Sequence, residues 1–244
     1  MQNRYVGDIG DYVKLAILRR LARGRRLGVA WWLFQDEDRN GDGGHREYLD
    51  RPEEWRRFDP SLFDALAIIN KGDRRAVCLL ENPSLLPNAS FVRELVPCEI
   101  LPFAQRPLER SRWLRDIRTR FKDRDLLFLD PDNGITPERL SLMRRSAGKS
   151  VSISELQELS ENRRTIIVYH HHSRRKGGHI QELRYLAQRL RDGGFRVSGA
   201  LRARPWSPRS FFILDGDGEF CMGARDISRI WDGRIEWHSD ADLE

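Results

Sequence analysis

Cysteine is scarce in this chain of 244 residues, and the three that occur lie far apart. Cys78, Cys98 and Cys221 form no Cys-x-x-Cys pair, which leaves no common structural zinc motif, and their odd number argues against a disulfide framework. Long apolar runs are also missing, since none approaches the roughly 18 residues that a transmembrane helix needs. The first residues lack the pattern of a cleaved signal, so the sequence predicts a cytoplasmic protein with no membrane segment.

Lysine is scarce as well, since only five of the 43 basic residues are Lys and the rest are Arg. The net charge of +6 and the isoelectric point near 9.5 favour a polyanionic partner, because clustered cations release counterions when they bind phosphates. The same arginine bias also follows from codon usage in a GC-rich genome, so charge alone leaves a nucleic-acid partner open. Seven Trp and eleven Phe indicate a packed interior rather than a disordered chain.

Segments typical of strands alternate with segments typical of helices along the whole chain. This alternation predicts one domain, residues 1–244, with a mostly parallel sheet covered by helices on both faces. The predicted strands are 27–34, 76–80, 99–103, 125–129, 165–169, 195–203 and 209–214. The predicted helices are 11–22, 60–70, 107–122, 152–160 and 180–191, with Asp11 as the expected cap of the first.

The last two predicted strands differ from the others in how they are connected. Only five residues, 204–208, join them, and this is too short for a helical crossover. The two strands must therefore form an antiparallel hairpin. The expected fold is α/β and Rossmann-like, with a mostly parallel seven-stranded sheet and a C-terminal antiparallel hairpin.

Polar side chains follow four of the predicted strands. Open α/β sheets bind ligands beyond the carboxyl ends of their strands, so these side chains mark one candidate edge of the sheet. They are Asp36 and Asp38, Glu81 and Asn82, Asp130 to Gly134, and His170 to Ser173.

The turn Asp130-Pro131-Asp132-Asn133-Gly134 is the sharpest of these signals. It follows the clearest core strand, Pro131 stiffens it, and Gly134 permits a positive φ. The composition also suits an ordinary turn. A carboxylate placed directly after a buried strand is nevertheless costly without a partner, so we expect this turn to form the centre of the site.

The segment before the first helix is a second candidate. It carries Gly7, Asp8, Asp11 and Lys14 around the expected start of the helix, where backbone amides and the helix dipole favour an anionic group. Lys14 would then bind a carboxylate or a phosphate. The alternative is a simple helix cap with a solvated lysine.

A histidine-rich and basic segment follows the strand at 165–169. Because side chains alternate along a strand, His170 and His172 are predicted to converge while His171 faces away. Three readings stay open: a metal site, a phosphate-binding loop and a solvated loop. The basic residues of the loop are Arg174, Arg175 and Lys176.

The predicted hairpin tip combines basic, aromatic and rigid residues. Arg204 and Arg209 would contact phosphates, and Trp206 would stack on a base. Equally, Trp206 would serve to cap the end of the core.

Two of these motifs resemble those of a known family. The opening YVGDIGDYVKLAILRRL is similar to the amino-terminal motif of the bacterial large-subunit ribosomal-RNA adenine-N6 methyltransferases, with Gly7, Asp8, Gly10, Asp11 and Lys14 in comparable places. Asp130-Pro131 stands where that family has its Asp-Pro-Pro-Tyr motif. At the second Pro and at the Tyr of that motif, this chain has Asp132 and Asn133. The chain thus looks like a diverged relative of the class I methyltransferases.

The resemblance implies an S-adenosylmethionine-dependent methyltransferase-like enzyme acting on nucleic acid. Lys14 would bind the methionine carboxylate, Asp36 or Glu81 would take the ribose hydroxyls, and Asp130 would accept a hydrogen bond from the target amine. The implied catalytic residues are Asp130, Asp132, Asn133 and His170. The implied cofactor residues are Gly7, Asp8, Asp11, Lys14, Asp36 and Glu81.

Two other functions fit the same residues. A nuclease or phosphodiesterase would hold Mg or Mn with Asp8, Asp130, Asp132 and His172, and the second carboxylate of the turn favours this reading. A nucleic-acid-binding module without catalysis is the third. The sequence leaves open the choice of DNA or RNA and the oligomeric state.

Overall fold

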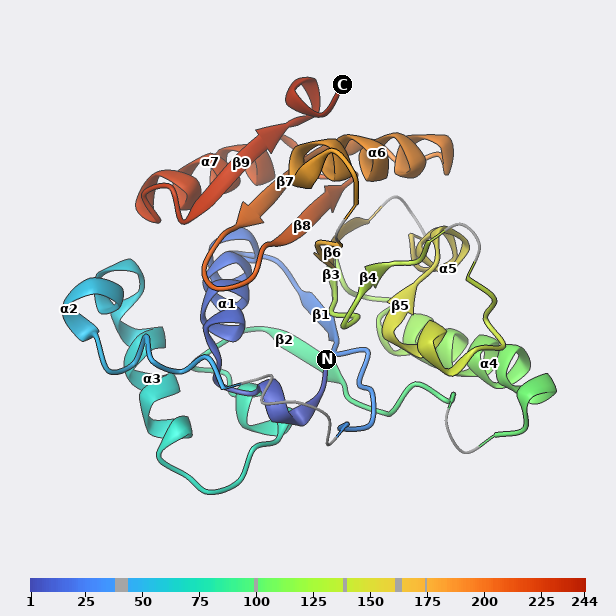
Figure 1. The fold of residues 1–244 in the computed structure, drawn as a ribbon, viewed down its shortest axis with the longest axis horizontal. Helices are drawn as coiled ribbons and strands as arrows, with labels where there is room; N and C mark the ends of the chain where they lie inside the picture. Colours follow the sequence, from blue (N-terminus) through green and yellow to red (C-terminus); the bar gives the residue numbers. More distant parts are fainter. Residues whose placement is uncertain (38–43, 99–100, 138–139, 161–163, 174) are drawn as a thin grey trace.

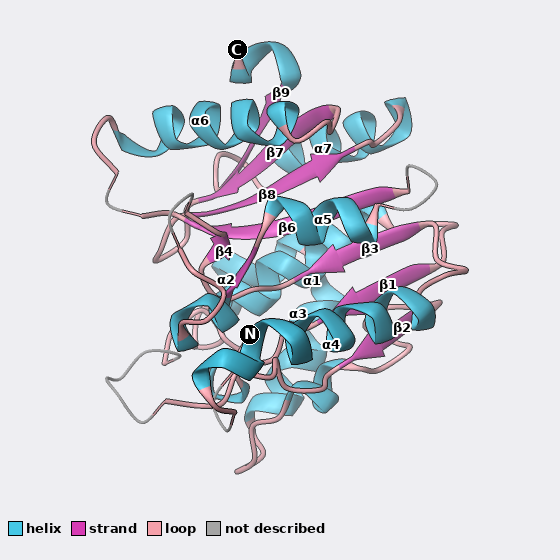
Figure 2. Ribbon diagram, turned by 90° about the vertical axis from the view of Figure 1, so that its right-hand side faces the viewer, coloured by secondary structure: helices cyan, strands magenta, loops and turns pink. Residues whose placement is uncertain are grey.

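The computed structural model describes residues 1–37, 44–98, 101–137, 140–160, 164–173 and 175–244. Its centre is a seven-stranded sheet, which Figure 2 shows from β9 at the top to β2 at the bottom. The strands lie in the order β2 (Ala89–Val92), β1 (Leu27–Ala30), β3 (Leu126–Leu129), β6 (Thr165–His171), β8 (Arg209–Leu214), β7 (Val197–Ala203) and β9 (Ile235–Ser239). The predicted α/β fold with a seven-stranded sheet is confirmed.

The first four strands of the sheet are parallel. Strand β1 pairs with β2 on one side and with β3 on the other, and β3 pairs with β6. Every residue of β1 and β3 is buried, which explains why both read as continuous apolar runs in the sequence. Strand β1 is shorter than predicted because Trp32 adopts a positive φ of 48° and ends the extended run.

The remaining strands make the sheet mixed rather than mostly parallel. Strand β8 is antiparallel to β6, and β7 is antiparallel to both β8 and β9. The predicted hairpin of β7 and β8 is therefore confirmed. The prediction of a mostly parallel sheet holds only for the half formed by β2, β1, β3 and β6, because β9 adds a further antiparallel strand at the edge.

Helices cover both faces of the sheet, as predicted (Figure 1). One apolar layer lies under α1 (Ile9–Leu21), α3 (Pro60–Asn70) and α7 (Gly218–Ile230). The other lies under α4 (Arg106–Arg120), α5 (Ile153–Leu159) and α6 (Gly178–Asp192). Side chains of β3 alternate between the layers, with Leu126 and Phe128 in the first and Leu127 and Leu129 in the second.

Smaller elements complete the described chain. A short helix, α2, spans Pro52–Trp55, and none of the helices in the described part combines the length and the apolar character needed to cross a bilayer. The 3-10 helices are Asn3–Tyr5, Arg56–Phe58, Val77–Leu80, Phe103–Gln105, Arg145–Lys149 and Asp240–Leu243.

Two predicted strands are absent from the described part of the chain. Residues Val77–Leu80 form a 3-10 helix, because a five-residue apolar run cannot be told from a buried turn by its pattern. The outer position of the sheet belongs instead to β2. Of the predicted strand 99–103, residues 99 and 100 lie outside the described residues, and Phe103 begins a 3-10 helix.

A second, two-stranded sheet follows the acidic turn directly. Strand β4 (Gly134–Ile135) pairs in parallel with β5 (Ser150–Val151). Gly134 has a φ of +84°, and a Cβ there would lie 2.4 Å from the Cα of His170. The positive φ predicted at Gly134 is confirmed, and the glycine also allows the close packing of β4 on β6.

Candidate active site

A cavity of about 320 Å³ lies at the carboxyl ends of β3 and β6, against the start of α1. The chain runs from β1 outward to β2 on one side, while β3 and β6 lie on the other, so the strand order reverses between β1 and β3. Such a reversal is where open α/β sheets bind ligands. The cavity is lined by Met1, Gln2, Tyr5, Asp8, Gly10, Asp11, Lys14, His45, Asp130, Asp132, Asn133, Lys149, Tyr169, His171, Ser207 and Arg209.

Asp130 is the carboxylate that the end of β3 delivers to this cavity. It is only 2% exposed, and its backbone N–H donates to the carbonyl of Ala30 across the strands. Its Oδ2 lies 2.6 Å from Nζ of Lys14. Its Oδ1 has no hydrogen-bond or ion-pair partner among the described residues, and Asp130 is one of the residues that line the cavity.

Lys14 bridges the two motifs that the sequence singled out. Its Nζ lies 2.9 Å from Oδ1 of Asp11 as well as beside Asp130. Burial lowers the pKa of Lys14, but the two carboxylates outweigh burial and hold the pKa above its ordinary value. Burial also raises the pKa of Asp11 to about 6, against the opposing effect of Lys14. The ammonium of Lys14 therefore serves the protein's own carboxylates, rather than standing free for a ligand.

The start of α1 is capped by Asp8 and not by Asp11. The Asp8 side chain accepts from the backbone N–H of Asp11 at 3.0 Å, and Asp11 lies in the first turn of the helix. The Oδ2 of Asp11 accepts from the backbone N–H of Gly7 at 2.9 Å. The expected cap was misplaced by three residues because Asp8 and Asp11 are both good capping residues and both precede apolar positions.

Asp132 is held by the beginning of the chain as the structure describes it. Its Oδ1 lies 2.7 Å from the amino nitrogen of Met1, and its Oδ2 accepts from Nε2 of Gln2 at 2.5 Å. Although burial raises it, these partners hold the pKa of Asp132 below its ordinary value. The next residue, Asn133, is exposed, and its side-chain amide makes no hydrogen bond with any described residue.

The cavity carboxylates are mostly occupied. Among the described residues, only Oδ2 of Asp8 and Oδ1 of Asp130 lack a hydrogen-bond or ion-pair partner in the set formed by Asp8, Asp11, Asp130 and Asp132. A divalent ion in an oxygen site takes about six to eight ligands. No described group of three or more His, Cys, Asp or Glu side chains is arranged to hold a metal ion. This donor set favours hydrogen-bonding chemistry at Asp130 over metal chemistry.

Tyr169 and His171 line the cavity from β6, and the sequence reasoning did not assign them to it. The hydroxyl of Tyr169 lies 3.3 Å from Nδ1 of His171, and burial raises the pKa of the tyrosine. The alternation of side chains along β6 was the available signal, since it places Tyr169 and His171 on one face. Other lining residues that were not predicted are Met1, Gln2, Tyr5, His45, Lys149 and Ser207.

His170 and His172 face the other way and converge, as predicted. Both approach the Glu182 carboxylate of α6, at 3.5 Å and 3.0 Å respectively. They line a second cavity and not the one that contains Asp130. His170 therefore does not share a cavity with Asp130, as its predicted catalytic role requires. His172 likewise lies apart from Asp8, Asp130 and Asp132, its predicted partners in a metal site.

Two predicted ribose-binding carboxylates lie away from the cavity. Asp36 accepts from the backbone N–H of Arg4, and Glu81 accepts from Nε1 of Trp31 and from Arg93. Glu81 was placed at a strand end because residues 76–80 were predicted to be a strand, which they are not. Asp38 lies outside the described residues.

The basic residues divide between the two cavities and the surface. Arg209 lines the first cavity and donates to the carbonyl of Ser207. Arg175 lines the second, with its guanidinium 3.6 Å from the ring centre of Tyr185. Lys176 is exposed, and Arg174 lies outside the described residues.

The hairpin tip stands at the mouth of the first cavity, since Ser207 and Arg209 also line that cavity. Trp206 is 38% exposed, with its ring centre 5.5 Å from that of Trp55 and the Arg51 guanidinium 5.6 Å away. One part of the ring thus packs on Trp55, while the role of Trp206 in stacking on a base stays a prediction. Arg204 is largely exposed and pairs with Glu236.

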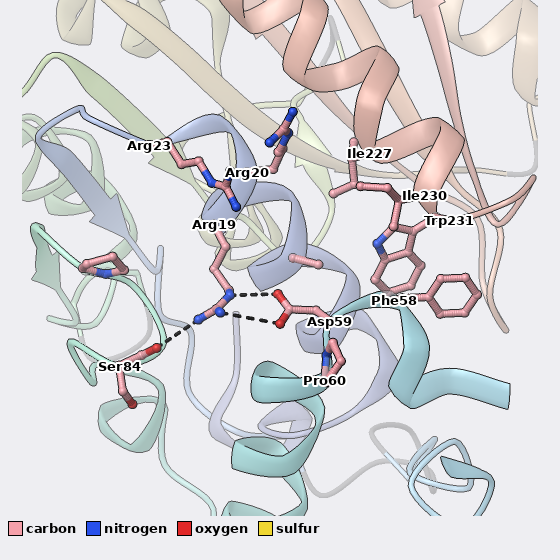
Figure 3. A pocket seen from close by; sticks show the side chains of 12 residues that line it. Arg19, Arg20, Arg23, Phe58, Asp59, Pro60, Ser84, Ile227, Ile230 and Trp231 are labelled. Atoms are coloured by element: carbon pink, nitrogen blue, oxygen red, sulfur yellow. Dashed lines mark hydrogen bonds and ion pairs between the residues drawn. The ribbon is translucent and has the colours of Figure 1, made fainter. Parts of the chain in front are cut away.

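Another hollow, of about 460 Å³, lies at the far end of α1 (Figure 3). Arg19 crosses it and binds the Asp59 carboxylate and the backbone carbonyl of Ser84. Arg20, from the same helix, and Arg23, just after its end, also line the hollow. Ile227 and Ile230 of α7, with Trp231 directly after it, form the apolar wall. None of the predicted site residues lies here, so we place the candidate active site at Asp130.

Comparison of the sequence with protein-family models gives no match, and comparison with curated proteins gives none either. The likeness to the methyltransferases therefore stays a prediction from sequence motifs. The functional proposal therefore rests on the residues that line the cavity.

Proposed function

We propose that the protein is an S-adenosylmethionine-dependent methyltransferase-like enzyme that acts on nucleic acid. The observation that supports this most is the state of Asp130. It is buried at the reversal of strand order, held by Lys14 through one oxygen, and without a partner among the described residues at the other. A fixed acceptor of this kind suits a substrate amine whose nitrogen gains positive charge during transfer.

Bound S-adenosylmethionine would supply the methyl group, with its carbon–sulfur bond breaking as a carbon–nitrogen bond forms. Oδ1 of Asp130 would accept a hydrogen bond from the amine and orient its lone pair toward the methyl carbon. The negative charge of Asp130 would stabilise the positive charge on the nitrogen until a proton leaves. Lys14 positions Asp130 through the contact of its Nζ with Oδ2, which replaces the role that the resemblance implied for this lysine.

The charges around the cavity fit a zwitterionic amino-acid group. Arg209 pairs with no carboxylate in the described part of the chain, so its guanidinium is available to the methionine carboxylate. Oδ2 of Asp8 is available to the ammonium group. Tyr169 offers an aromatic ring on the strand next to Asp130, in place of the aromatic residue that Asn133 replaces.

The nucleic-acid partner is supported by the hairpin tip beside the cavity. Trp206 exposes part of its ring, Arg204 lies on the same tip, and the guanidinium of Arg51, just before α2, lies 5.6 Å from the ring centre. Exposed aromatic and cationic side chains are the usual means of holding unpaired bases and phosphates. Arg209, being buried, is assigned to the cofactor and not to the nucleic acid.

Transfer of a labelled methyl group tests the proposal. The protein is incubated with methyl-labelled S-adenosylmethionine and mixed RNA or DNA, and cofactor binding is measured in parallel by titration calorimetry. We expect transfer by the wild type, with a loss of about 100-fold or more in Asp130→Asn. Asn133→Ala is a second variant at the cavity, and it removes no side-chain hydrogen bond to a described residue. Ser111→Ala, on α4, is the control and should transfer the methyl group as the wild type does.

No heat with millimolar S-adenosylmethionine, together with no labelled product, would contradict the proposal. Cleavage of the nucleic acid upon addition of Mg²⁺ or Mn²⁺ would replace it with the phosphodiesterase function.

A further inference from the structure

The hollow at the far end of α1 has two walls of different chemistry (Figure 3). Arginines from α1 and from the turn after it lie on one side, and the side chains at the end of α7 lie on the other. The volume of about 460 Å³ falls within the roughly 300–1,000 Å³ of small-molecule sites. None of the residues that line this hollow lines the Asp130 cavity, so the hollow is a separate candidate site.

The first wall carries more positive charge than the surrounding acidic groups neutralise. Arg19 pairs with the Asp59 carboxylate, and Arg20 pairs with the Asp226 carboxylate of α7. Arg23 is exposed, and its guanidinium has no ion-pair or hydrogen-bond partner among the described residues. The carboxyl end of α1 contributes the equivalent of only about half a negative charge, so an excess of positive charge is left in the hollow.

Asp59, the acidic side chain of the lining, is already occupied. Its Oδ2 accepts from Nε of Arg19 at 2.8 Å. Its Oδ1 accepts from the backbone N–H of Leu62 at 3.1 Å and from Oγ of Ser61 at 3.2 Å, and so caps α3. A cation entering the hollow would meet guanidinium groups and a carboxylate that is already bound, so the charges favour an anion.

Trp231 adds a hydrogen-bond donor to the same space. The residue is 1% exposed, and its ring stacks on that of Phe58 with 4.8 Å between the ring centres. Its Nε1 has no partner in the described part of the chain, and it is not one of the side-chain nitrogens that the core encloses. Figure 3 shows this nitrogen on the edge of the ring that faces α1. Because an indole N–H can only donate, it calls for an acceptor from outside the fold.

The second wall is apolar. Ile230, the last residue of α7, is 51% exposed, while Ile227 and Phe58 line the hollow with little exposed surface. Covering such surface with the apolar part of a ligand is favourable at about 25 cal/mol per Å². A ligand with an apolar body and one anionic group therefore matches both walls.

We propose that this hollow binds a small organic anion. The carboxylate or phosphate group of the ligand lies between the Arg23 guanidinium and Nε1 of Trp231, and its apolar body packs against Ile230. Arg19 keeps its bonds to Asp59 and to the backbone carbonyl of Ser84. One free guanidinium beside an apolar wall suits a single anionic group with a carbon skeleton, and not the repeated phosphates of a nucleic acid.

Three probes with the same phenyl body test the charge preference. They are phenyl phosphate, 3-phenylpropionate and the cationic 2-phenylethylamine. Titration of nitrogen-15-labelled protein is followed by NMR, and the indole N–H signal of Trp231 is assigned from its loss in Trp231→Phe. We expect this signal to move to saturation with the anions and to stay in place with the amine. The anion that binds more tightly identifies the preferred group as phosphate or carboxylate.

The variants test the two donors separately. Arg23→Ala should weaken binding of the tighter anion about 10-fold or more, because it removes a charge-assisted hydrogen bond. Trp231→Phe keeps an aromatic ring beside Phe58 and should weaken binding about 3- to 10-fold. Arg112→Ala changes the net charge by the same amount on α4 and should bind as the wild type does.

Stability does not obscure the result at Arg23. Its side chain has no described partner, so Arg23→Ala should unfold at the same temperature as the wild type even if Trp231→Phe is destabilised. A Trp231 signal that neither anion moves at millimolar concentration would overturn the proposal. Binding that Arg23→Ala leaves unchanged, or equal binding of the amine, would overturn it as well. Binding of S-adenosylmethionine at the Asp130 cavity is independent of each of these outcomes, because the two sites share no residue.

Discussion

Lys14 determines how the acidic residues at the centre of the molecule behave. Two carboxylates that approach each other under burial would repel, and one of them would take up a proton. The Lys14 ammonium lies between Asp11 and Asp130 and reduces that penalty. The lysine is thus a positioning residue, and its removal should be felt first in stability.

Lys14→Met tests this role directly. The change leaves Asp11 and Asp130 buried without their shared cation, and breaking a buried ion pair from one side costs about 3–5 kcal/mol. Urea unfolding should show a loss of free energy of unfolding of this size. Lys71→Met, at an exposed lysine, is the matched control. A loss no larger than that of the control would show that Lys14 does not hold the carboxylates.

His172 predicts a particular pH dependence of stability. Its folded pKa of about 4 lies below the ordinary value of 6.5, so the folded state binds fewer protons than the unfolded state between these values. The stabilisation is complete above pH 6.5 and is lost as the pH falls toward 4. Asp11, with its raised pKa, contributes in the opposite direction.

Comparison with His172→Asn isolates this contribution, since the variant lacks the titrating group while Asp11 is unchanged. Between pH 7 and pH 4.5, the wild type should lose about 2 kcal/mol more free energy of unfolding than the variant. Denaturant unfolding at the two pH values provides the measurement. Equal losses in the two proteins would show that His172 is not held neutral by its surroundings.

At the level of residues, the sequence predicted several side chains of the candidate site but not which of them contact one another. Asp8, Asp11, Lys14 and Asp130 were predicted from two separate motifs, and the structure brings them into one cavity. Lys14 and Asp130 are 116 residues apart in the sequence, so no local pattern indicates their contact. Tyr169 was not predicted because the sequence argument considered His170 and His172, which lie on the opposite face of the strand.

Gly134 links the acidic turn to the small sheet, and its effect belongs to the scale of the elements. A side chain there would adopt a strained positive φ and place its Cβ 2.4 Å from the Cα of His170. Gly134→Ala should therefore lower the free energy of unfolding by at least about 2 kcal/mol. Gly218→Ala, where no atom lies within 4 Å, should stay close to the wild type in the same thermal and urea unfolding measurements. Similar stabilities for the two variants would contradict the close packing of β4 on β6.

The proposed binding of nucleic acid at the hairpin tip between β7 and β8 leads to a prediction about its salt dependence. Arg204→Ala removes one exposed cation, so the slope of log K against log salt for a single-stranded oligonucleotide should fall by about one. Fluorescence anisotropy at several salt concentrations measures this slope. Arg112→Ala, an exposed arginine on α4 across the sheet, should leave it unchanged. An unchanged slope in Arg204→Ala would remove the tip from the binding surface.

The strands that the sequence predicted correctly are those that form buried, continuous apolar runs. Strand β3 and the apolar part of β6 are fully buried runs with clear ends, and the short loop of the hairpin left one possible pairing. Strands β2 and β9 were not predicted because most of their residues are only half-buried and show no apolar run. Pattern alone therefore finds the centre of this sheet more readily than its edges.

At the scale of the whole molecule, the mixed sheet places both cavities at one end. The parallel half brings the ends of β3 and β6 together, and the antiparallel half returns the hairpin tip to the same end. One cavity is polar and contains Asp130, and the other is largely apolar and contains Ser150. Because side chains alternate along β6, Tyr169 lines the first cavity and His170 lines the second.

A crystal structure with bound S-adenosylhomocysteine, the product of methyl transfer, tests the central claim most directly. The account predicts density for its amino-acid group between Arg209 and Asp8, with its sulfur directed toward Asp130. An empty cavity at saturating ligand, or ligand bound only in the hollow at the far end of α1, would contradict it.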